Sequence, residues 1–171
     1  ALRHAKDSGA KVLAICNTNS STIPRESDAV IYTHAGPEIA VASTKAFLTQ
    51  VVATYLIGLY LGQVMGTLNE RQIETLYNEM LELPAKIEQI LETVEPLREL
   101  TRSFADSTSV LFLGRHVGYP VALEGALKLK ELAYMHAEGF AGGELKHGPI
   151  ALIDQGTPVI AIVPNTHENG L

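Results

Sequence analysis

The chain has few of the residues that build disulfide frameworks and aromatic clusters. Its 171 residues include one cysteine and no tryptophan, and only 6% of them are aromatic. The single cysteine, Cys16, excludes an internal disulfide framework and fits a reducing compartment. The first residues show no secretory signal peptide. We therefore expect a cytoplasmic protein with an ordinary apolar core, for which 46% hydrophobic residues are sufficient.

The chain also lacks an excess of positive charge. It has 13 Lys and Arg residues against 19 Asp and Glu residues, which gives a net charge of −6 at pH 7. Because no basic cluster stands out, we do not expect nucleic acid to be a partner. Backbone amides could still hold a small anionic ligand. No spacing of His, Cys and Asp residues indicates a metal site.

A hydrophobic run of membrane-spanning length is missing as well. The most apolar long run, residues 51–64, is too short and too interrupted for a membrane span. We interpret it as part of a long buried helix at residues 41–65, and we expect no membrane segment. This helix is apolar on nearly all sides and needs more cover than a small sheet provides, which favours a homodimer.

Short apolar runs separated by helical patterns indicate the fold class. Residues 11–16, 29–33, 109–113 and 158–163 are typical of buried strands in a parallel sheet. Residues 17–27 are predicted as a loop, 69–100 as two amphipathic helices broken near Leu83 and Pro84, and 97–105 as a short helix. This order predicts an α/β fold with doubly wound parallel sheets flanked by helices.

Residues 119–149 carry the densest group of ionisable side chains. On a helix, Glu124, Lys128 and Glu131 fall within about 60° of one another, opposite a core-facing stripe of Ala122, Ala126, Leu129 and Ala133. An ordinary solvated ion pair would give the same pattern. Three glycines then precede Glu144, Lys146 and His147, in a turn of the kind where proton-transfer chemistry occurs. The pattern alone leaves Glu131 and His147 equally compatible with catalytic and structural roles.

Several motifs along the chain resemble one enzyme family. They are residues 14–17, 25–28, 38–45, 113–115, 122–131, 136–138 and 143–149. Together they resemble the isomerase region of the glutamine–fructose-6-phosphate aminotransferase (glucosamine-6-phosphate synthase) family. The resemblance covers the whole chain, and the combination of motifs is far more specific than the Glu-Leu-Lys-His-Gly-Pro motif at 144–149 alone.

The resemblance implies a domain organisation and a reaction. It implies two tandem sugar isomerase (SIS) subdomains, with residues 1–66 in the first, 67–98 as a helical connector and 99–171 in the second. The family makes glucosamine 6-phosphate from fructose 6-phosphate and ammonia, which a glutaminase domain of the same full-length chain supplies. The implied protein is a homodimer and needs no cofactor.

The resemblance also assigns roles to individual residues. It implies that Glu131 moves the proton between C1 and C2 of the sugar and that His147 opens the sugar ring. It implies that Lys128 stabilises negative charge or orients Glu131. Val41 and Ser43 would contact the sugar through backbone and hydroxyl, although Ser43 alone is also compatible with an ordinary helix N-cap.

Some parts of the family pattern are missing from the 171 residues. The phosphate-binding loop is expected upstream of Ala1, and the C-terminal tail with its imine-forming lysine and the glutaminase domain are also absent. We therefore expect a fragment, truncated in both subdomains and inactive by itself. Two alternatives are a non-catalytic SIS-type regulator that binds a sugar phosphate, and a simple sugar-phosphate isomerase without a glutaminase domain.

Overall fold

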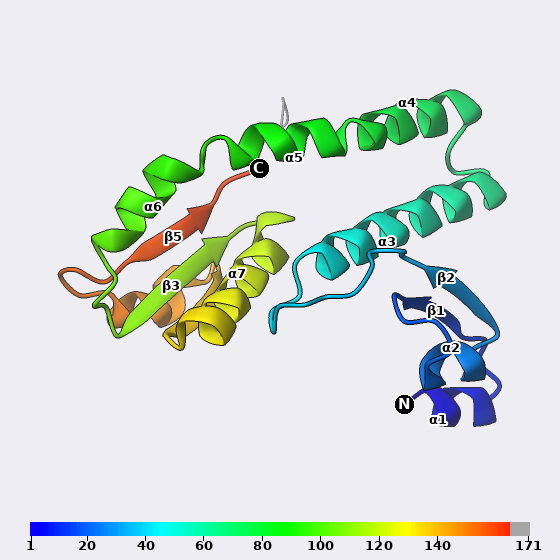
Figure 1. Ribbon diagram of the computed structural model, residues 1–171, viewed down its shortest axis with the longest axis horizontal. Coiled ribbons are helices and arrows are strands. Elements are labelled where there is room, and N and C mark those ends of the chain that lie inside the picture. The colour runs from blue at the N-terminus through cyan, green and yellow to red at the C-terminus, as the bar shows by residue number, and fades with distance from the viewer. Residues whose placement is uncertain (165–171) are drawn as a thin grey trace. The chain divides into compact units, whose positions relative to one another are not determined.

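The computed structural model describes residues 1–164, and the chain divides into two compact units (Figure 1). The first unit is Ala1–Glu88 and the second is Gln89–Leu171. The division falls inside a helix of the predicted connector, and the predicted subdomain limits stay predictions. Each unit is described by itself.

The first unit is built on a pair of parallel strands. Leu13 pairs with Ala29 and Cys16 with Tyr32, and the intervening residues form the crossover that parallel strands require. Its elements are α1 (Leu2–Asp7), β1 (Leu13–Cys16), α2 (Thr22–Glu26), β2 (Ala29–Tyr32), α3 (Lys45–Val64), α4 (Glu70–Leu81) and most of α5 (Leu83–Leu91). Both strands are where the apolar runs predict them. The short helix α2 was not predicted, because Pro24 suggests a loop although proline is tolerated in a first helical turn.

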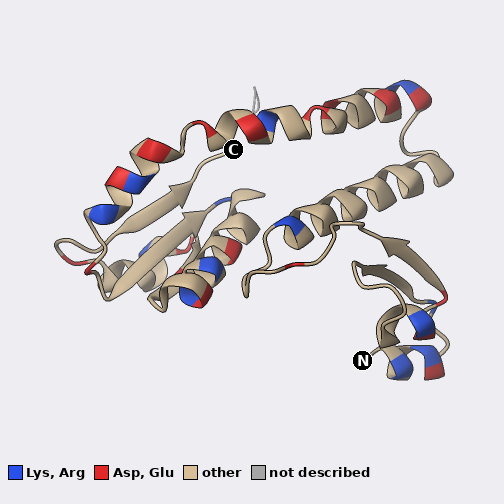
Figure 2. Cartoon of the chain, in the orientation of Figure 1, with Lys and Arg blue, Asp and Glu red and all other residues tan. Residues whose placement is uncertain are grey.

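Helix α3 is the most apolar element of the unit, with Lys45 as its only charged residue (Figure 2). It packs on β1 and on α4, and Ala53, Leu59 and Gly62 are buried. Its other large apolar side chains are more exposed, with Tyr60 at 65% of its surface, so the additional cover that the sequence predicts for this helix stays a prediction. The helix begins at Lys45, four residues later than the predicted Val41.

The apolar run at residues 51–64 is predicted to be too short for a membrane span, but the helix that contains it is longer than the run. The helix has 20 residues with a mean hydropathy of 1.4 and 17% of its 18-residue window buried, so by length and composition it could cross a membrane. Core helices of soluble proteins meet the same two criteria. Within the first unit it contacts β1 and α4.

Three helices follow α3, the same number as the two helices predicted at 69–100 and the short helix predicted at 97–105. Helix α4 begins with a capping box. Oδ1 of Asn69 accepts from the backbone N–H of Gln72 at 3.0 Å, and Oε1 of Gln72 accepts from the backbone N–H of Asn69 at 3.0 Å. Helix α5 follows directly, with Pro84 in its first turn, as the predicted break near Leu83 requires. Helix α6 (Val94–Arg102) begins three residues before the predicted start at Leu97.

The second unit is a three-stranded parallel sheet with the order β4-β3-β5. Its elements after the end of α5 are α6, β3 (Ser109–Gly114), α7 (Gly118–Ala133), β4 (His136–Ala141), two short 3₁₀ turns η1 (Leu145–His147) and η2 (Pro149–Leu152), and β5 (Val159–Ile162). The chain passes from β3 through α7 to β4, and then crosses to the other side of β3. Because strands on both sides of β3 are parallel to it, the predicted doubly wound α/β fold is confirmed.

The core of this unit lies between β3 and α7. Val110 and Phe112 on the strand meet Ala122 and Ala126 on the helix, and all four are buried. Full burial of a side chain the size of phenylalanine contributes about 1.5–3 kcal/mol. A Cβ on Gly125 would lie 2.9 Å from Cε1 of Phe112, so the glycine lets the helix approach the strand closely. This packing fixes which face of α7 points away from the sheet.

Strand β4 is the main element that the sequence analysis missed. Residues 136–141 were interpreted as the approach to a glycine-rich turn, but they pair in register with β3 over six residues. Gly139, the first of the three glycines predicted to form the turn before Glu144, therefore lies in the sheet. Ala133, predicted in the core-facing stripe, is exposed because α7 ends there.

Candidate active site

Three charged side chains meet on the outer face of α7, as the helical spacing predicts. Nζ of Lys128 lies 2.7 Å from Oε2 of Glu131 and 3.2 Å from Oε1 of Glu124. The side chains retain 21%, 31% and 24% of their exposure respectively, so the cluster is half-buried. One turn of a helix separates the partners, and the buried alanine face on the opposite side holds that turn against the sheet.

The cluster keeps Lys128 as a cation. The hydrogen bond to Glu131, followed by the bond and charge of Glu124, raises the pKa of Lys128 above its usual value. At neutral pH the ammonium therefore donates to Oε2 of Glu131. The second oxygen of that carboxylate, Oε1, takes no part in this bond, and it can accept a proton from a ligand.

Glu131 lies near the end of α7, where the chain turns back into the sheet. The C-cap of the helix is Tyr134, whose φ of 55° is left-handed. Such a conformation is usual for glycine or asparagine at this position and uncommon for tyrosine. Strand β4 begins two residues later at His136. Glu131 is thus placed by a rigid helix and by a sharp turn.

A second pair of ionisable groups occupies turn η1. Nδ1 of His147 lies 2.8 Å from Oε2 of Glu144, and both side chains are exposed. The turn is held by backbone bonds from Glu144 N to Ala141 O at 2.8 Å and from His147 N to Glu144 O at 2.9 Å. Since an ionised carboxylate only accepts hydrogen bonds, Nδ1 of a neutral His147 carries the hydrogen and Nε2 is left as the acceptor.

The structure brings together some of the predicted site residues and leaves others apart. Lys128 and Glu131 form the pair described above. Within residues 1–164, no hydrogen bond or ion pair joins His147 to either of them. Val41 and Ser43 belong to the first unit, where they lie in the loop before α3. Val41 exposes 92% of its surface, and Ser43 is not the N-cap, which is Thr44.

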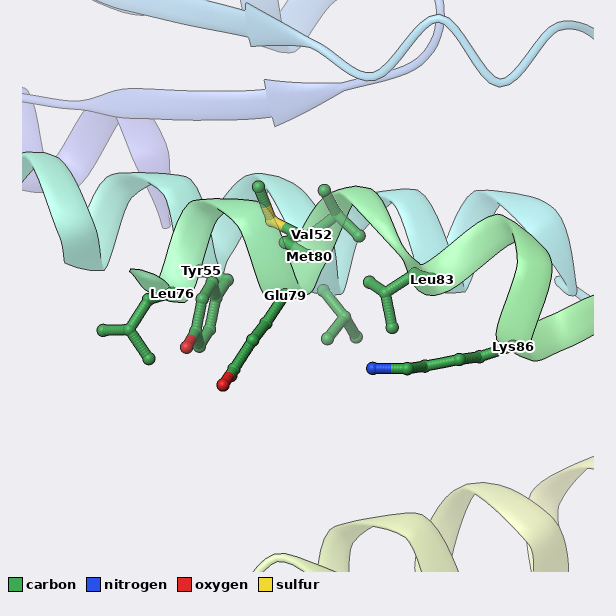
Figure 3. Close-up of a pocket in the computed structure, with 8 residues that line it drawn as sticks. Val52, Tyr55, Leu76, Glu79, Met80, Leu83 and Lys86 are labelled. Atoms are coloured by element: carbon green, nitrogen blue, oxygen red, sulfur yellow. The ribbon is translucent and has the colours of Figure 1, made fainter. Parts of the chain in front are cut away.

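Each unit has at least one hollow in its surface. In the first unit, a mostly apolar groove of about 300 Å³ runs between α3 and the α4–α5 helices (Figure 3). Glu79 and Lys86 are the charged residues among those that line it. In the second unit, a hollow of about 320 Å³ opens at the carboxyl ends of β3 and β4, beside Arg115 and Gly142. Ligands of doubly wound sheets bind at this edge.

Sequence reasoning gave no role to two carboxylates that contact the predicted site segments. Glu144 bonds to His147, and Glu38 bonds to the start of α3 next to Ser43. The three-residue spacing from Glu144 to His147 is a signal that could have indicated the first contact. The second depends on how the segment after β2 folds back, which no local pattern reveals. Among the described residues, no group of three or more His, Cys, Asp or Glu side chains could hold a metal ion.

Comparison with known families defines the class of protein. The model of the SIS domain matches residues 1–60 and 103–170. These segments contain β1, β2 and most of α3 in the first unit, and all three strands of the second. The chain therefore belongs to the SIS domain family.

Within that family the chain is similar to isomerising glutamine–fructose-6-phosphate aminotransferases. It is 67% identical over 165 residues to the enzyme of Streptomyces coelicolor, a match that covers 96% of this chain and 27% of that enzyme. It is 64% identical over 165 residues to the enzyme of Mycobacterium tuberculosis, covering 96% and 26%. The chain thus spans about a quarter of the length of the curated relatives it matches. The resemblance found in the sequence motifs is confirmed.

Solved structures agree with this placement. The C-terminal domain of glucosamine-fructose-6-phosphate aminotransferase from Francisella tularensis matches with a TM-score of 0.94 and 42% identity, over 97% of this chain and 47% of that one. Glucosamine-6-phosphate deaminase from Thermotoga maritima matches with a TM-score of 0.56 and 24% identity, over 87% of this chain and 43% of that one. The second likeness is one of fold alone.

Proposed function

We propose that the chain is part of the isomerase region of an enzyme that makes glucosamine 6-phosphate from fructose 6-phosphate and glutamine-derived ammonia. The observation that carries this proposal is the high identity, over almost the whole chain, to enzymes named for that reaction. The Lys128–Glu131 pair on α7 supports it, because the reaction needs a held carboxylate that can take up and return a proton.

Glu131 is the proposed proton carrier. Ammonia first condenses with the C2 ketone of the open-chain sugar, and water leaves to give a C2 imine. The Glu131 carboxylate removes a proton from C1, the C1–C2 double bond forms, and the electrons of the C2–N double bond move to the nitrogen, which takes up a proton from solvent. The resulting carboxylic acid then returns its proton to C2, which restores the carboxylate, while the C1 hydroxyl loses its proton to solvent and becomes the C1 aldehyde. Oε1 is suited to this step because the bond from Lys128 is made to Oε2. A single carboxylate on one face of a planar intermediate can serve both transfers.

Lys128 and His147 have supporting roles in the proposal. The Lys128 ammonium orients Glu131 and stabilises negative charge that develops on the intermediate. His147 opens the furanose ring by removing the proton of the C2 hydroxyl and delivering a proton to the ring oxygen, so that the C2–O5 bond breaks. Because Nδ1 is bonded to Glu144, Nε2 is the ring nitrogen that exchanges these protons with the sugar.

The remaining proposals concern binding and assembly. Val41 and Ser43 contact the sugar, and a glutaminase domain of the full-length protein supplies ammonia. The full-length protein acts as a homodimer in the cytoplasm. The proposed subdomains are residues 1–66 and 99–171, with the helices of residues 67–98 between them.

The test replaces Glu131 by glutamine in the full-length protein. Loss of a general base commonly costs about 10²–10⁴-fold in rate, so exchange of solvent hydrogen into the sugar should fall by that factor. Glutamine hydrolysis should continue. Glu95→Gln is the matched control, because Glu95 lies on exposed α6 in a surface ion pair with Arg98.

The same assay separates the competing functions. Conversion of fructose 6-phosphate to glucose 6-phosphate without use of glutamine would identify a simple isomerase. Binding of fructose 6-phosphate without hydrogen exchange, in wild-type protein, would identify a non-catalytic regulator. Exchange that stays within a few-fold of wild type in Glu131→Gln means that another group carries the proton.

A further inference from the structure

The segment between β2 and α3 is fixed at its start by Asn17, which directly follows β1. The Asn17 Nδ2 group donates to Gly36 O at 2.6 Å. Its Oδ1 accepts from Ala35 N at 2.8 Å and from the Thr33 hydroxyl at 3.1 Å. One amide side chain therefore ties the beginning of the segment to the end of β1.

The other end of the segment is fixed by Glu38. Its Oε2 accepts from the backbone N–H of Thr44 at 3.2 Å and of Ala46 at 3.1 Å, and its Oε1 accepts from the Thr44 hydroxyl at 3.3 Å. Thr44 is the N-cap of α3, and its own side chain makes no capping bond. The first N–H groups of a helix need acceptors, and the N-terminus favours negative charge. Glu38 therefore caps α3 from a distance of six residues in sequence.

The charge of Glu38 supports this role. Glu38 is half-buried. The hydrogen bond from Ala46 is the largest cause that lowers its pKa, followed among the lowering causes by the bonds from Thr44 and the charge of Lys45. A carboxyl group with a lowered pKa stabilises the folded state above its ordinary pKa of about 4.3, and this contribution is lost as the pH falls through the lower folded value. Glu38 is thus an anion throughout the neutral range.

The bonds of Glu38 close a short loop, residues 39–43. Ala42 is completely buried at 0% exposure and holds the middle of the loop against the unit. Its neighbour Val41 exposes 92% of its surface, so one of the two adjacent residues is buried and the other is almost fully exposed. The loop therefore presents Val41 outward while Glu38 and Ala42 fix its backbone.

We propose that Glu38 is a positioning residue for the sugar-binding segment Val41–Ser43. The inference rests on the proposed function, in which that segment contacts fructose 6-phosphate. Glu38 acts through the backbone of α3 and the loop, and it does not itself touch the sugar. Loss of its carboxylate releases the segment, so each encounter with the sugar must order the loop again.

The kinetic test compares Glu38→Ala and Glu38→Gln in the full-length protein. Losing a helix cap commonly costs the equivalent of about a five- to tenfold change in an equilibrium, so the KM for fructose 6-phosphate should rise by that factor in Glu38→Ala. Glu38→Gln keeps one acceptor oxygen and should show a smaller rise. In both variants kcat should change less than about twofold, because the lost interaction is the same in the ground and transition states.

Glu26→Gln is the matched control. Glu26 lies in the same unit, is bonded to the side chain of Arg3 and also has a lowered pKa, but it makes no bond to the loop or to α3. Its KM should equal that of wild type. The ratio of the Glu38→Ala and wild-type KM values should be constant between about pH 6 and 8, because Glu38 titrates below that range. An unchanged KM in Glu38→Ala, or a fall in kcat equal to the fall in kcat/KM, would overturn the proposal.

A second measurement does not depend on turnover. In wild type, the Thr44 and Ala46 amides should be protected from hydrogen exchange, and Glu38→Ala should accelerate their exchange while Glu26→Gln leaves it unchanged. Unchanged exchange in Glu38→Ala refutes the positioning role. If wild type does not turn over fructose 6-phosphate, the proposed function fails and the link to the sugar with it. The exchange rates then still decide whether Glu38 holds the segment.

Discussion

Lys128 is bonded to two carboxylates, and this determines what each of them can contribute. Glu124 and Glu131 are one turn of α7 before and after the ammonium, at 3.2 and 2.7 Å. Without the cation, two half-buried carboxylates would face each other with nothing between them. Glu124 also restrains the ammonium from the side opposite Glu131. The lysine can therefore hold Glu131 in one orientation, as a proton carrier requires.

His147 is predicted to act only on the ring form of the sugar. The 5-deoxy analogue of fructose 6-phosphate lacks the hydroxyl that closes the furanose ring, so it is always open. In the full-length protein, His147→Ala should lose about 10²-fold or more with fructose 6-phosphate but stay within about threefold of wild type with the analogue. The measurement is hydrogen exchange at C1 of each sugar.

His4→Ala is the control for this comparison, because His4 lies exposed on α1 at the surface of the other unit. It should behave as wild type with both sugars. Equal losses of His147→Ala on the two sugars would show that His147 acts in the proton transfer itself or in binding. Glu144→Gln should resemble a weaker His147→Ala, since it retains an acceptor for Nδ1.

At the scale of elements, the contact between α7 and β4 determines where Glu131 lies. Helix α7 packs on β3 through small residues, and Gly139 of β4 lies directly under the helix backbone. A Cβ at Gly139 would lie 2.9 Å from Cα and 3.0 Å from N of Leu123. Backbone atoms cannot move aside as the end of a flexible side chain can. Because α7 is one regular helix, the position of Glu131 near its end depends on this contact at Leu123 in its first half.

Gly139→Ala is predicted to destabilise this contact. Overpacking of a close contact commonly costs about 1–3 kcal/mol, so native-state hydrogen exchange of the β4 amides should become faster by the corresponding factor. Gly143→Ala is the control, since nothing lies within 4 Å of a Cβ at that position. Its effect should stay within about 0.5 kcal/mol. Equal exchange rates in the two variants would mean that β4 shifts to accept the methyl group without cost.

Strands with continuous apolar runs were predictable from the sequence, and strands without them were not. Ser109–Gly114 and Val159–Ile162 read as buried strands because their side chains are apolar on both faces. Residues 136–141 contain His136, Glu138 and Gly139, a composition that favours a turn. Their pairing is decided by tertiary contacts, namely the burial of Ala137 and the close approach of α7.

The candidate site was predictable to the same extent. Helical spacing places Glu124, Lys128 and Glu131 together because all three lie on one regular element. The bonds of Glu38 arise where the chain folds back on itself, between residues six and eight positions apart with no regular structure between them. Local periodicity contains no information about such a contact. The residues that support a site are therefore harder to predict than the residues that react.

At the scale of the whole molecule, the prediction of a homodimer bears on how the proposed site is assembled. His147 lies on an exposed turn, and its bond within the described part of the chain is to Glu144. Helix α3 leaves many apolar side chains exposed, and a second copy is the predicted cover. The resemblance to glutamine–fructose-6-phosphate aminotransferases implies that this histidine reaches the site of the neighbouring subunit, and we predict accordingly that Glu131 of one chain and His147 of the other serve the same site in a homodimer.

Mixing two inactive full-length variants tests this arrangement. In a mixed dimer of Glu131→Gln and His147→Ala, a shared arrangement gives one site with both defects and one site with neither. Random exchange of subunits makes about half of all dimers mixed, so about a quarter of the wild-type activity should return. Sites built within single chains would contain one defect each, and none would recover.

Subunit exchange can be followed by mass spectrometry of differently labelled chains. A mixture that exchanges subunits and yet stays inactive would rule out the shared site. Activity should also return only at the rate of subunit exchange, which separates complementation from slow refolding of either variant.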